Sequence, residues 1–231
     1  MITAADNYKK AILILSGGMD SATLLYHLLD LKIHPICVSF NYGQRHKKEL
    51  VCAEKLAEVN KLHWELIDLS QLRHLLKGSS QTDDSVPVPV GQYDAENMKL
   101  TVVPNRNMIM LSIAMGIAIA NDITQVFYGA HAGDHTIYPD CRPEFIEKLN
   151  EVAYICYWKQ VQVVAPFSLM TKGEICTQGI EMKVPYELTW TCYTESEKPC
   201  GICGSCNERI SAFEFAHAKD PLEYLGGVAH G

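Results

Sequence analysis

Apolar residues follow two different patterns along this chain. Short apolar runs with the length of buried strands occupy residues 11–15, 33–43, 63–69, 124–130 and 161–166. Apolar positions three or four apart predict helices over residues 22–29, 46–60, 107–120, 143–156 and 172–182. Strands that alternate with helices in this way require right-handed crossovers, with helices covering both faces of a parallel sheet. The pattern therefore predicts an α/β fold built on a doubly wound parallel sheet.

Three stretches allow finer predictions. The apolar residues of the helix over 46–60 share one face: Leu50, Val51, Ala53, Leu56 and Ala57. The helix over 107–120 is apolar on nearly all sides and is predicted to be buried. Residues 78–100 are rich in Gly, Ser, Asp and Pro, which predicts a long loop and a candidate lid.

The composition indicates one globular core with a small addition. The chain has 231 residues, of which 48% are hydrophobic and 20% charged, enough to bury one full core. Beyond Tyr186 the alternation of strands and helices stops and cysteines become frequent. We therefore predict a main α/β domain over residues 1–186 and a small cysteine-rich element over residues 187–231, packed on the edge of the main domain.

The charge balance bears on the class of partner. A net charge of −7 and a sequence pI of about 5.7 disfavour a surface that grips nucleic acid, because phosphate neutralisation needs clustered Lys and Arg. The first ten residues lack the apolar core of a signal peptide. The longest apolar run, 108–120, is shorter than the roughly 20 residues of a membrane span. These features predict a cytoplasmic protein that acts on small molecules, without nucleic acid or membrane.

The turn SGGMDS lies between the first predicted strand and the first predicted helix. Unpaired backbone amides at a helix N-terminus attract anions such as phosphate. Gly17 and Gly18 let a ligand approach the backbone, because no Cβ stands in the way. Ser16 and Ser21 add hydroxyl groups, and Asp20 is placed to cap the helix or to face a metal ion. The spacing matches neither a Walker A motif nor GxGxxG, and an ordinary capped turn without a ligand is the alternative.

Four of the nine cysteines crowd together near the C-terminus: Cys192, Cys200, Cys203 and Cys206. Their C-x2-C-x2-C spacing lets tight turns aim several thiolates at one ion, and four such ligands complete the closed tetrahedron of structural zinc. We predict one zinc ion per chain. An iron-sulfur cluster and four unliganded thiols are the alternatives. Four other cysteines are predicted to be small buried hydrophobes: Cys37, Cys52, Cys156 and Cys176.

Polar stretches also follow later predicted strands. Ligands bind at the carboxyl ends of parallel strands, so residues 41–46 and 131–145 are expected to converge on the SGGMDS turn. Arg45 could clamp a carboxylate or a phosphate, or could open the next helix in solvent. Arg106, at the mouth of a predicted buried helix, is placed to meet an anion. Lys172, at the start of a later helix, would reach a triphosphate or be solvated.

The stretch GAHAGDHTIYPDCRPEF groups side chains suited to a substrate pocket. Asp134 or Asp140 could accept hydrogen bonds from a purine-like pair of N–H groups. Arg142 could meet a carboxylate, and Tyr138 or Phe145 could stack on a flat ring. The predicted substrate-binding residues are Tyr42, Gln44, Arg45, Arg106, His131, Asp134, Tyr138, Asp140 and Arg142.

The turn SGGMDS, in this strand-to-helix context, resembles the PP-loop of the adenine nucleotide α-hydrolase superfamily, which wraps the pyrophosphate of ATP. Taken in order, SGGMDS, FNYGQRH, VPNRN, GAHAGDHTIYPDCRPEF and CYTESEKPCGICGSC resemble the 7-cyano-7-deazaguanine synthase family of queuosine biosynthesis. The resemblance covers about residues 11–216. It implies ATP-dependent conversion of 7-carboxy-7-deazaguanine and ammonia to the nitrile, through an acyl-adenylate and an amide, with release of AMP and diphosphate.

The resemblance also assigns residues. It makes one run of residues the ATP loop: Leu15, Ser16, Gly17, Gly18, Met19, Asp20, Ser21, Ala22, Thr23, Leu24 and Leu25. It makes the four clustered cysteines zinc ligands, places Mg²⁺ beside ATP and implies a homodimer. The predicted catalytic residues are Asp20, Ser21, Arg45 and Lys172.

Two other functions stay open on the sequence. One is a PP-loop enzyme that adenylates a tRNA base for thiolation, which would need a basic face that the acidic balance does not favour. The other is a nucleotide-binding or zinc-stapled interaction module without catalysis. One α/β domain and a metal-binding element leave no room for a glutaminase, so ammonia is expected to be free or brought by a partner protein. The main interpretation predicts turnover with ammonium salts alone.

Overall fold

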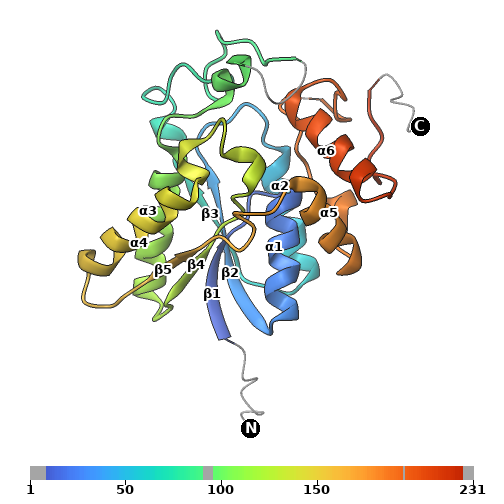
Figure 1. Ribbon diagram of the computed structural model, residues 1–231. Helices are drawn as coiled ribbons and strands as arrows, with labels where there is room; N and C mark the ends of the chain where they lie inside the picture. The colour runs from blue at the N-terminus through green and yellow to red at the C-terminus, as the bar shows by residue number, and fades with distance from the viewer. Residues whose placement is uncertain (1–8, 91–95, 195, 226–231) are drawn as a thin grey trace.

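The computed structural model describes residues 9–90, 96–194 and 196–225 (Figure 1). In this part of the chain, parallel strands form a sheet in the order β3-β2-β1-β4-β5. The strands are β1 (Lys9–Ile14), β2 (Ile33–Asn41), β3 (Trp64–Asp68), β4 (Gln125–Phe127) and β5 (Gln162–Val164). Each predicted strand is present, and the strand order reverses beside β1. The doubly wound α/β prediction is confirmed.

Helices cover both faces of this sheet. They are α1 (Met19–Asp30), α2 (Lys48–Val59), α3 (Arg106–Ala120), α4 (Pro143–Cys156), α5 (Lys172–Glu181) and α6 (Gly204–Phe215). In Figure 1, α3 and α4 lie on one side of the strands, and α1, α2 and α5 lie on the other. Within β1, Ile12 packs into the core beneath α3, whereas its neighbour Leu13 packs into the core beneath α1. Successive side chains of a strand point to opposite faces, so a continuous apolar run is buried on both.

In two helices, α2 and α3, some residues are more exposed than the sequence predicts. In α2, Val51 is 48% exposed, because it lies beyond the edge of the apolar face that contacts the sheet. The buried residues of α2 are Leu50, Ala53, Leu56 and Ala57. In α3, the prediction of burial on all sides is wrong, since Ser112 and Gly116 are exposed. The helix forms an outer layer on the sheet, so only one of its faces reaches the core. That face consists of Met110, Leu111, Ala114, Met115 and Ala118.

The described residues contain one stretch with the length and composition of a membrane span, Met98–Ala120. The stretch is not one continuous α-helix, because the short 3-10 helix η2 (Glu96–Thr101) and a left-handed residue, Asn105, precede α3. At 15 residues, α3 itself is shorter than the roughly 20 residues needed to span a bilayer. One face of α3 packs against β1 and β4. The stretch therefore does not indicate a membrane protein.

Residues 78–100 contain more structure than a plain loop. Residues 79–82 are all buried, and Val90 forms an isolated antiparallel bridge with Cys203. Residues 91–95, in the middle of the proposed lid, lie outside the described residues. The N-terminal part of this stretch therefore belongs to the packed wall of the molecule, and the lid itself stays a prediction.

A buried ion pair anchors the C-terminal residues to the main domain. The guanidinium of Arg209, on α6, donates hydrogen bonds of 2.7 and 2.9 Å to the carboxylate of Asp220. It also donates to Thr189 Oγ1, 2.6 Å away, and to the carbonyl oxygen of Tyr186. Together with packing of α6 on α5, these bonds fix the cysteine-rich residues against the α/β core. The division into residues 1–186 and 187–231 stays a prediction.

Candidate functional site

A cavity opens at the carboxyl edge of the sheet, where β1, β2 and β4 end. Its walls come from the SGGMDS turn, the start of α3, the segment after β4, the start of α5 and the residues around the cysteines. Many of the predicted site residues line it together: Leu15, Ser16, Gly18, Asp20, Ser21, Tyr42, Arg106, His131, Asp134, Tyr138 and Lys172. The predicted convergence of three polar stretches at this edge therefore occurs.

The two glycines of the turn have different roles. Gly17 has a φ of +87°, and a Cβ there would lie 1.9 Å from the backbone carbonyl oxygen of Glu49 in α2. Its missing side chain therefore makes room for α2, and not for a ligand as the sequence suggested. Gly18 lines the cavity, and its N–H donates to Ser16 Oγ, 3.2 Å away.

Ser16 and Ser21 form a small hydroxyl cluster at the mouth of α1. Their Oγ atoms lie 3.0 Å apart, Ser16 N–H donates to Ser21 Oγ, and Ser21 Oγ–H donates to the carbonyl oxygen of Gly18. Such hydroxyls can turn towards an anion at the helix N-terminus. The rest of the assigned loop points elsewhere, into the core or towards the Tyr186 hydroxyl: Met19, Ala22, Thr23, Leu24 and Leu25.

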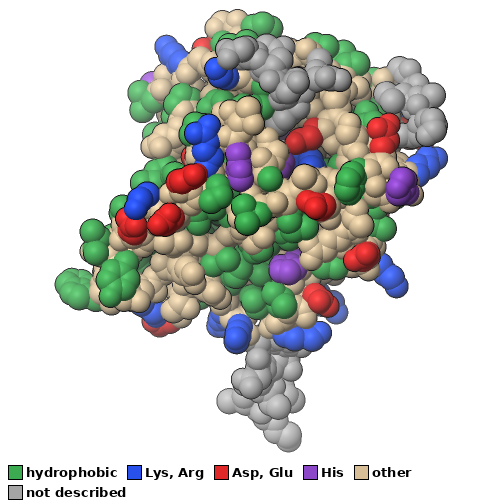
Figure 2. All heavy atoms as spheres, viewed as in Figure 1, with side chains coloured by type: hydrophobic (Ala, Val, Ile, Leu, Met, Phe, Trp, Pro, Cys, Tyr) green, Lys and Arg blue, Asp and Glu red, His purple; other side chains and the backbone are tan. Residues whose placement is uncertain are grey.

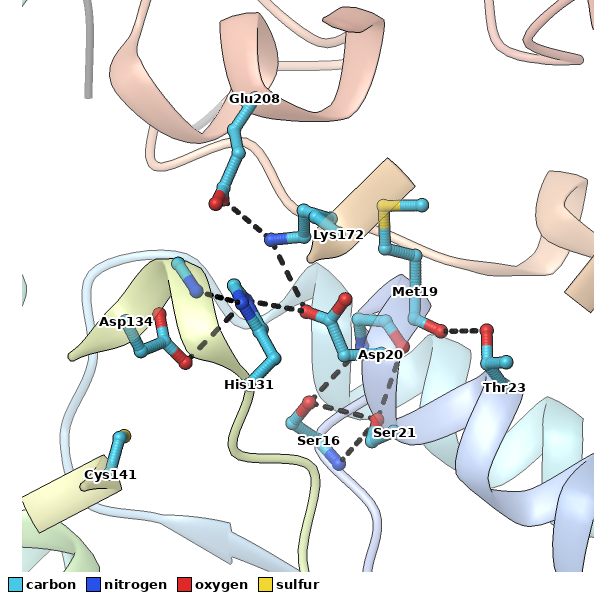
Figure 3. A network of polar contacts seen from close by, with 12 residues as sticks. Ser16, Met19, Asp20, Ser21, Thr23, His131, Asp134, Cys141, Lys172 and Glu208 are labelled. Carbon is cyan, nitrogen blue, oxygen red and sulfur yellow. Dashed lines mark hydrogen bonds and ion pairs between the residues drawn. The ribbon is translucent and has the colours of Figure 1, made fainter. Parts of the chain in front are cut away.

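Asp20 does not cap α1, because the N-cap position is held by Gly18 without a side-chain hydrogen bond. Its Oδ2 lies 3.2 Å from Lys172 Nζ (Figure 3). Its Oδ1 is buried and has no hydrogen-bond partner among the described residues. A desolvated carboxylate oxygen without a donor is costly, so this atom is suited to a cation bound at the site.

Lys172 is held between two carboxylates from distant parts of the chain. Thr171 and Glu174 form a capping box that fixes the first turn of α5 and so the position of the lysine. The ammonium lies 2.6 Å from Glu208 Oε2 on α6, opposite Asp20 (Figure 3). Burial alone would lower the pKa of Lys172, but the Asp20 and Glu208 carboxylates outweigh it and hold the pKa well above its ordinary value. The side chain is therefore a fixed cation inside the cavity.

His131 joins the same network from the segment after β4. Its Nδ1 accepts a hydrogen bond from Gly133 N–H, 3.1 Å away. In the neutral ring this places the proton on Nε2, which lies 3.5 Å from Asp134 Oδ2 and 3.8 Å from Asp20 Oδ2. His131, Asp134 and Asp20 thus form a polar chain across the floor of the cavity (Figure 3).

Aromatic rings and one arginine form the opposite wall. The guanidinium of Arg106 lies 5.7 Å from the centre of the Tyr42 ring, with Nη1 3.4 Å from the Tyr42 hydroxyl. The Tyr138 hydroxyl lies 2.6 Å from Thr101 Oγ1. Burial raises the pKa of Tyr42 to about 12, so this phenol stays neutral and able to donate a hydrogen bond. The wall offers flat apolar surface together with a fixed positive charge.

Four of the predicted substrate-binding residues do not line this cavity. Arg45 donates to the carbonyl oxygens of Asp83 and Val86, because the chain after residue 82 passes beside it. The Gln44 side chain closes the turn after β2, where its Oε1 accepts from Tyr42 N–H. Asp140 accepts from a backbone N–H in the first turn of α3, and Arg142 donates to the carbonyl oxygen of His135. These side chains satisfy backbone groups in the structure, so their binding and catalytic roles rest on the sequence alone.

The cavity also contains side chains that the sequence analysis missed: Glu49, Gln81, Thr101, Tyr128, Trp190, Tyr193, Ser205 and Glu208. Their positions depend on how distant segments pack, which local patterns do not report. Glu208 lies two residues after the last clustered cysteine. Nothing in the sequence around it indicates that its carboxylate pairs with Lys172 on α5.

The four clustered cysteines meet as predicted for a metal centre. Among the described residues, their Sγ atoms all lie within 4.8 Å of one another, and Cys200 Sγ lies 3.9 Å from Cys206 Sγ. A tetrahedral zinc with Zn–S bonds of roughly 2.3 Å would separate its ligands by about 3.8 Å. The N–H groups of Cys200 and Cys203 also donate to cysteine sulfurs, which favours thiolates. The cluster can therefore hold a metal ion.

The remaining cysteines fit the prediction only in part. Cys37 and Cys176 are buried. Cys52 is half-buried and Cys156 is exposed, because Cys156 ends α4 at the surface.

A family model described as queuosine biosynthesis protein QueC matches residues 10–217 of this chain. The chain belongs to the QueC family. QueC relatives are similar over nearly their whole length. The 7-cyano-7-deazaguanine synthase of Pseudoalteromonas atlantica is 50% identical over 216 residues, which cover 94% of this chain and 99% of that protein. The synthase of Chromohalobacter salexigens is 45% identical over 228 residues, which cover 99% of this chain and 91% of that protein.

Solved structures with the same fold are much more distant in sequence than these QueC relatives. A 4-thiouridine synthetase in complex with RNA and bound ATP is 18% identical, with a TM-score of 0.55, and the match covers 90% of this chain and 50% of that one. An NMN synthetase from Francisella tularensis is 11% identical, with a TM-score of 0.50, over 92% of this chain and 79% of that one. These similarities show the shared fold.

Proposed function

We propose that this chain converts 7-carboxy-7-deazaguanine and ammonia to 7-cyano-7-deazaguanine, with cleavage of ATP to AMP and diphosphate. Its relatives at 45–50% identity are named for this nitrile product. The observation that carries the proposal is the placement of Lys172, a fixed cation, beside Asp20 of the SGGMDS turn at the ligand-binding edge of the sheet. The arrangement suits the stabilisation of a departing diphosphate.

The first step activates the carboxylate, which resists attack by ammonia because of its negative charge. A carboxylate oxygen attacks the α-phosphorus of ATP, so an acyl-adenylate forms and diphosphate leaves. The N-terminal amides of α1, the hydroxyls of Ser16 and Ser21 and the ammonium of Lys172 would stabilise the charge that develops on diphosphate. We therefore assign the role of catalytic residue to Ser21 and Lys172.

The later steps build the nitrile. Ammonia adds to the carbonyl carbon of the acyl-adenylate, AMP leaves, and loss of a proton gives the amide. The amide oxygen then attacks a second ATP at the α-phosphorus, and diphosphate leaves. AMP then departs with the former amide oxygen as the C≡N bond forms and two protons are lost. The chain's own task is to hold the reactants in line and to exclude water, which would hydrolyse the acyl-adenylate.

Asp20 is the residue that we assign to Mg²⁺. Its buried Oδ1 lacks a donor among the described residues and would be satisfied by a hard cation that accompanies ATP. When bound, Mg²⁺ supplies charge neutralisation on the phosphates. The cysteine cluster is assigned one structural Zn²⁺ per chain, because all four ligands are thiols of one closed set.

The same proposal includes small-molecule partners, a cytoplasmic location and a homodimer. On the face shown in Figure 2, the side chains of Lys and Arg are interspersed with those of Asp and Glu. No basic area is visible on that face among the residues drawn in colour, which favours small molecules over the alternative of tRNA thiolation.

Exposed apolar residues at the end of α4, Ile155 and Trp158, are candidates for the dimer contact, and analytical ultracentrifugation tests the assembly.

The decisive experiment supplies the zinc-loaded protein with ATP, Mg²⁺, an ammonium salt and 7-carboxy-7-deazaguanine. Mass spectrometry should detect the amide and then the nitrile, with two AMP for each nitrile formed. The Lys172→Met variant should lose roughly 10²- to 10³-fold in kcat, the scale seen when one charge-stabilising donor is removed. Lys55→Met, an exposed lysine on α2, is the matched control and should match the unmodified protein.

Three results would contradict the proposed function. The first is the absence of both amide and nitrile with the loaded protein. The second is a strict requirement for glutamine and a second protein as the nitrogen source. The third is tight tRNA binding that weakens steeply with salt, which would favour the thiolation alternative.

A further inference from the structure

Residues 79–82 fold into the molecule, although the sequence there predicts a polar loop. All four residues are buried, and Gln81 retains 3% of its exposure. Three hydrogen bonds from backbone N–H groups hold the segment. Ser80 N–H donates to the carbonyl oxygen of Leu100, and Arg45 N–H donates to the carbonyl oxygen of Gln81. Gln81 N–H donates to Ser79 Oγ. The position of Gln81 is therefore fixed by the chain on both sides of it.

The side chain of Gln81 reaches the cavity. Gln81 lines the cavity, and its Nε2 is buried with no hydrogen-bond partner among the described residues. A buried amide donor without a partner destabilises a fold, so natural proteins satisfy nearly all such groups. An unpaired donor that is held rigidly at a ligand cavity is best explained by a partner on the ligand.

The side chains that line the cavity with Gln81 indicate which chemical group of a ligand it contacts. Tyr42 and Tyr138 line the same cavity and offer rings on which a flat heterocycle can stack. A glutamine amide presents a donor and an acceptor side by side in one plane, which matches the edge of a purine base. A phosphate offers acceptors alone, and the cavity already provides Lys172 and the hydroxyls of the SGGMDS turn for it.

We propose that Gln81 binds the hydrogen-bonding edge of a purine-type ring and thereby determines specificity for it. This inference rests on the proposed function, which supplies two such rings: the adenine of ATP and the deazapurine of the carboxylic acid. Gln81 is preorganised for either ring, because its backbone bonds hold it in place before a ligand arrives.

The test measures the two ligands separately. Calorimetry gives the Kd of ATP and the Kd of 7-carboxy-7-deazaguanine for the full chain and for Gln81→Met, which keeps the side-chain length and removes both polar groups. We expect one Kd to rise roughly 5- to 150-fold, the range for loss of a bidentate base contact. The ligand whose Kd rises contains the ring that Gln81 contacts. Gln71→Met, at an exposed glutamine ten residues earlier in the chain, should change neither Kd.

A second variant covers the case in which Gln81→Met fails to fold. Gln81→Glu keeps the shape and one acceptor but loses the donor, and it should weaken binding of the same ligand. The unmodified protein should also discriminate against a ligand that lacks the acceptor atom on that edge of the ring, and Gln81→Glu, which has no donor for this atom, should discriminate less. Binding of both ligands within twofold of the unmodified protein in a folded variant would overturn the proposal.

The binding readout separates this inference from the proposed function. If the unmodified protein makes no nitrile, the proposed function fails, while the calorimetric comparison still decides whether Gln81 contacts a purine-type ring. If the nitrile forms normally and neither Kd changes in the variants, the proposed function stands and the inference about Gln81 is wrong.

Discussion

The cysteine cluster and the cavity at the SGGMDS turn adjoin each other but are built in opposite ways. In the cluster, four sulfurs face one another within 4.8 Å, and peptide N–H groups donate to them. In the cavity, Asp20 Oδ1 and Gln81 Nε2 are buried without a partner among the described residues. A closed ligand set stabilises the fold, whereas unsatisfied groups cost stability until a ligand arrives. The difference indicates which region maintains the structure and which region binds and releases molecules.

Glu208 connects the two regions. It belongs to α6, whose N-cap is Cys203 of the cluster, yet its carboxylate lies 2.6 Å from Lys172 in the cavity. The structural region therefore supplies one of the two carboxylates that hold the cationic lysine. The following predictions test how far the division between a structural cluster and a functional cavity holds.

The largest effect is expected from removal of one cysteine ligand. Cys203→Ser should lose the metal and greatly lower the unfolding temperature, because structural zinc contributes on the order of 10 kcal/mol to folding. Elemental analysis should give about one zinc per chain for the unmodified protein, and the lack of visible absorption should exclude an iron-sulfur cluster. Cys156→Ser, at an exposed cysteine, is the control. A Cys203→Ser protein that keeps its metal and stability would contradict a structural site.

A smaller loss of stability is expected at the buried ion pair beside the cluster. Burial alone would raise the pKa of Asp220, but the hydrogen bonds from Arg209 outweigh it and lower the pKa below its ordinary value. A lowered folded-state pKa gives stability that is present above the unfolded pKa of about 3.9 and is lost as pH falls through the folded value. Asp220→Asn should therefore cost about 3–5 kcal/mol at pH 7.

Urea unfolding at several pH values checks whether the stability contributed by Asp220 falls as pH falls. The difference in unfolding free energy between Asp220→Asn and the unmodified protein should shrink as pH falls below about 4, because the carboxylate becomes protonated first in the unfolded chain and then, at its lower folded-state pKa, in the native protein. Asp30→Asn, at the exposed end of α1, should show no comparable loss at pH 7. A difference that stays constant from pH 7 to pH 3 would show that the charge of Asp220 is not the source of the effect.

The smallest effect, and the most informative one, is expected at Glu208. Glu208→Gln keeps the shape of the side chain but removes one of the two charges that hold Lys172, so kcat should fall by about tenfold, as for the loss of one charge-assisted hydrogen bond. Zinc content and unfolding temperature should change little. Glu214→Gln, an exposed residue of the same helix, should leave kcat unchanged. An unchanged kcat in Glu208→Gln would mean that α6 serves the fold alone.

The sequence predicted the frame of the molecule more fully than its cavity. Periodicity sufficed for the strands and helices, because an apolar run such as that of β1 is buried on both faces wherever the sheet forms. The spacing of the cysteines was equally informative, since their ligand geometry is local. Arg45 and Asp140 do not line the cavity, because tertiary packing brings a loop carbonyl to Arg45 and the first turn of α3 to Asp140, and no local pattern specifies either contact. Gln81 and Glu208 were missed for the same reason: each reaches the cavity through tertiary packing.

A backbone hydrogen bond joins the SGGMDS turn to a residue that lies far along the chain. The N–H of Trp190 donates to the carbonyl oxygen of Gly17, 2.9 Å away. The ribosome synthesises the turn at residue 17 early, but Trp190 and Glu208 emerge only after most of the chain. The SGGMDS turn is therefore completed late in translation, and a nascent chain that stops at residue 186 carries the turn without Trp190 and Glu208, which complete the cavity around it.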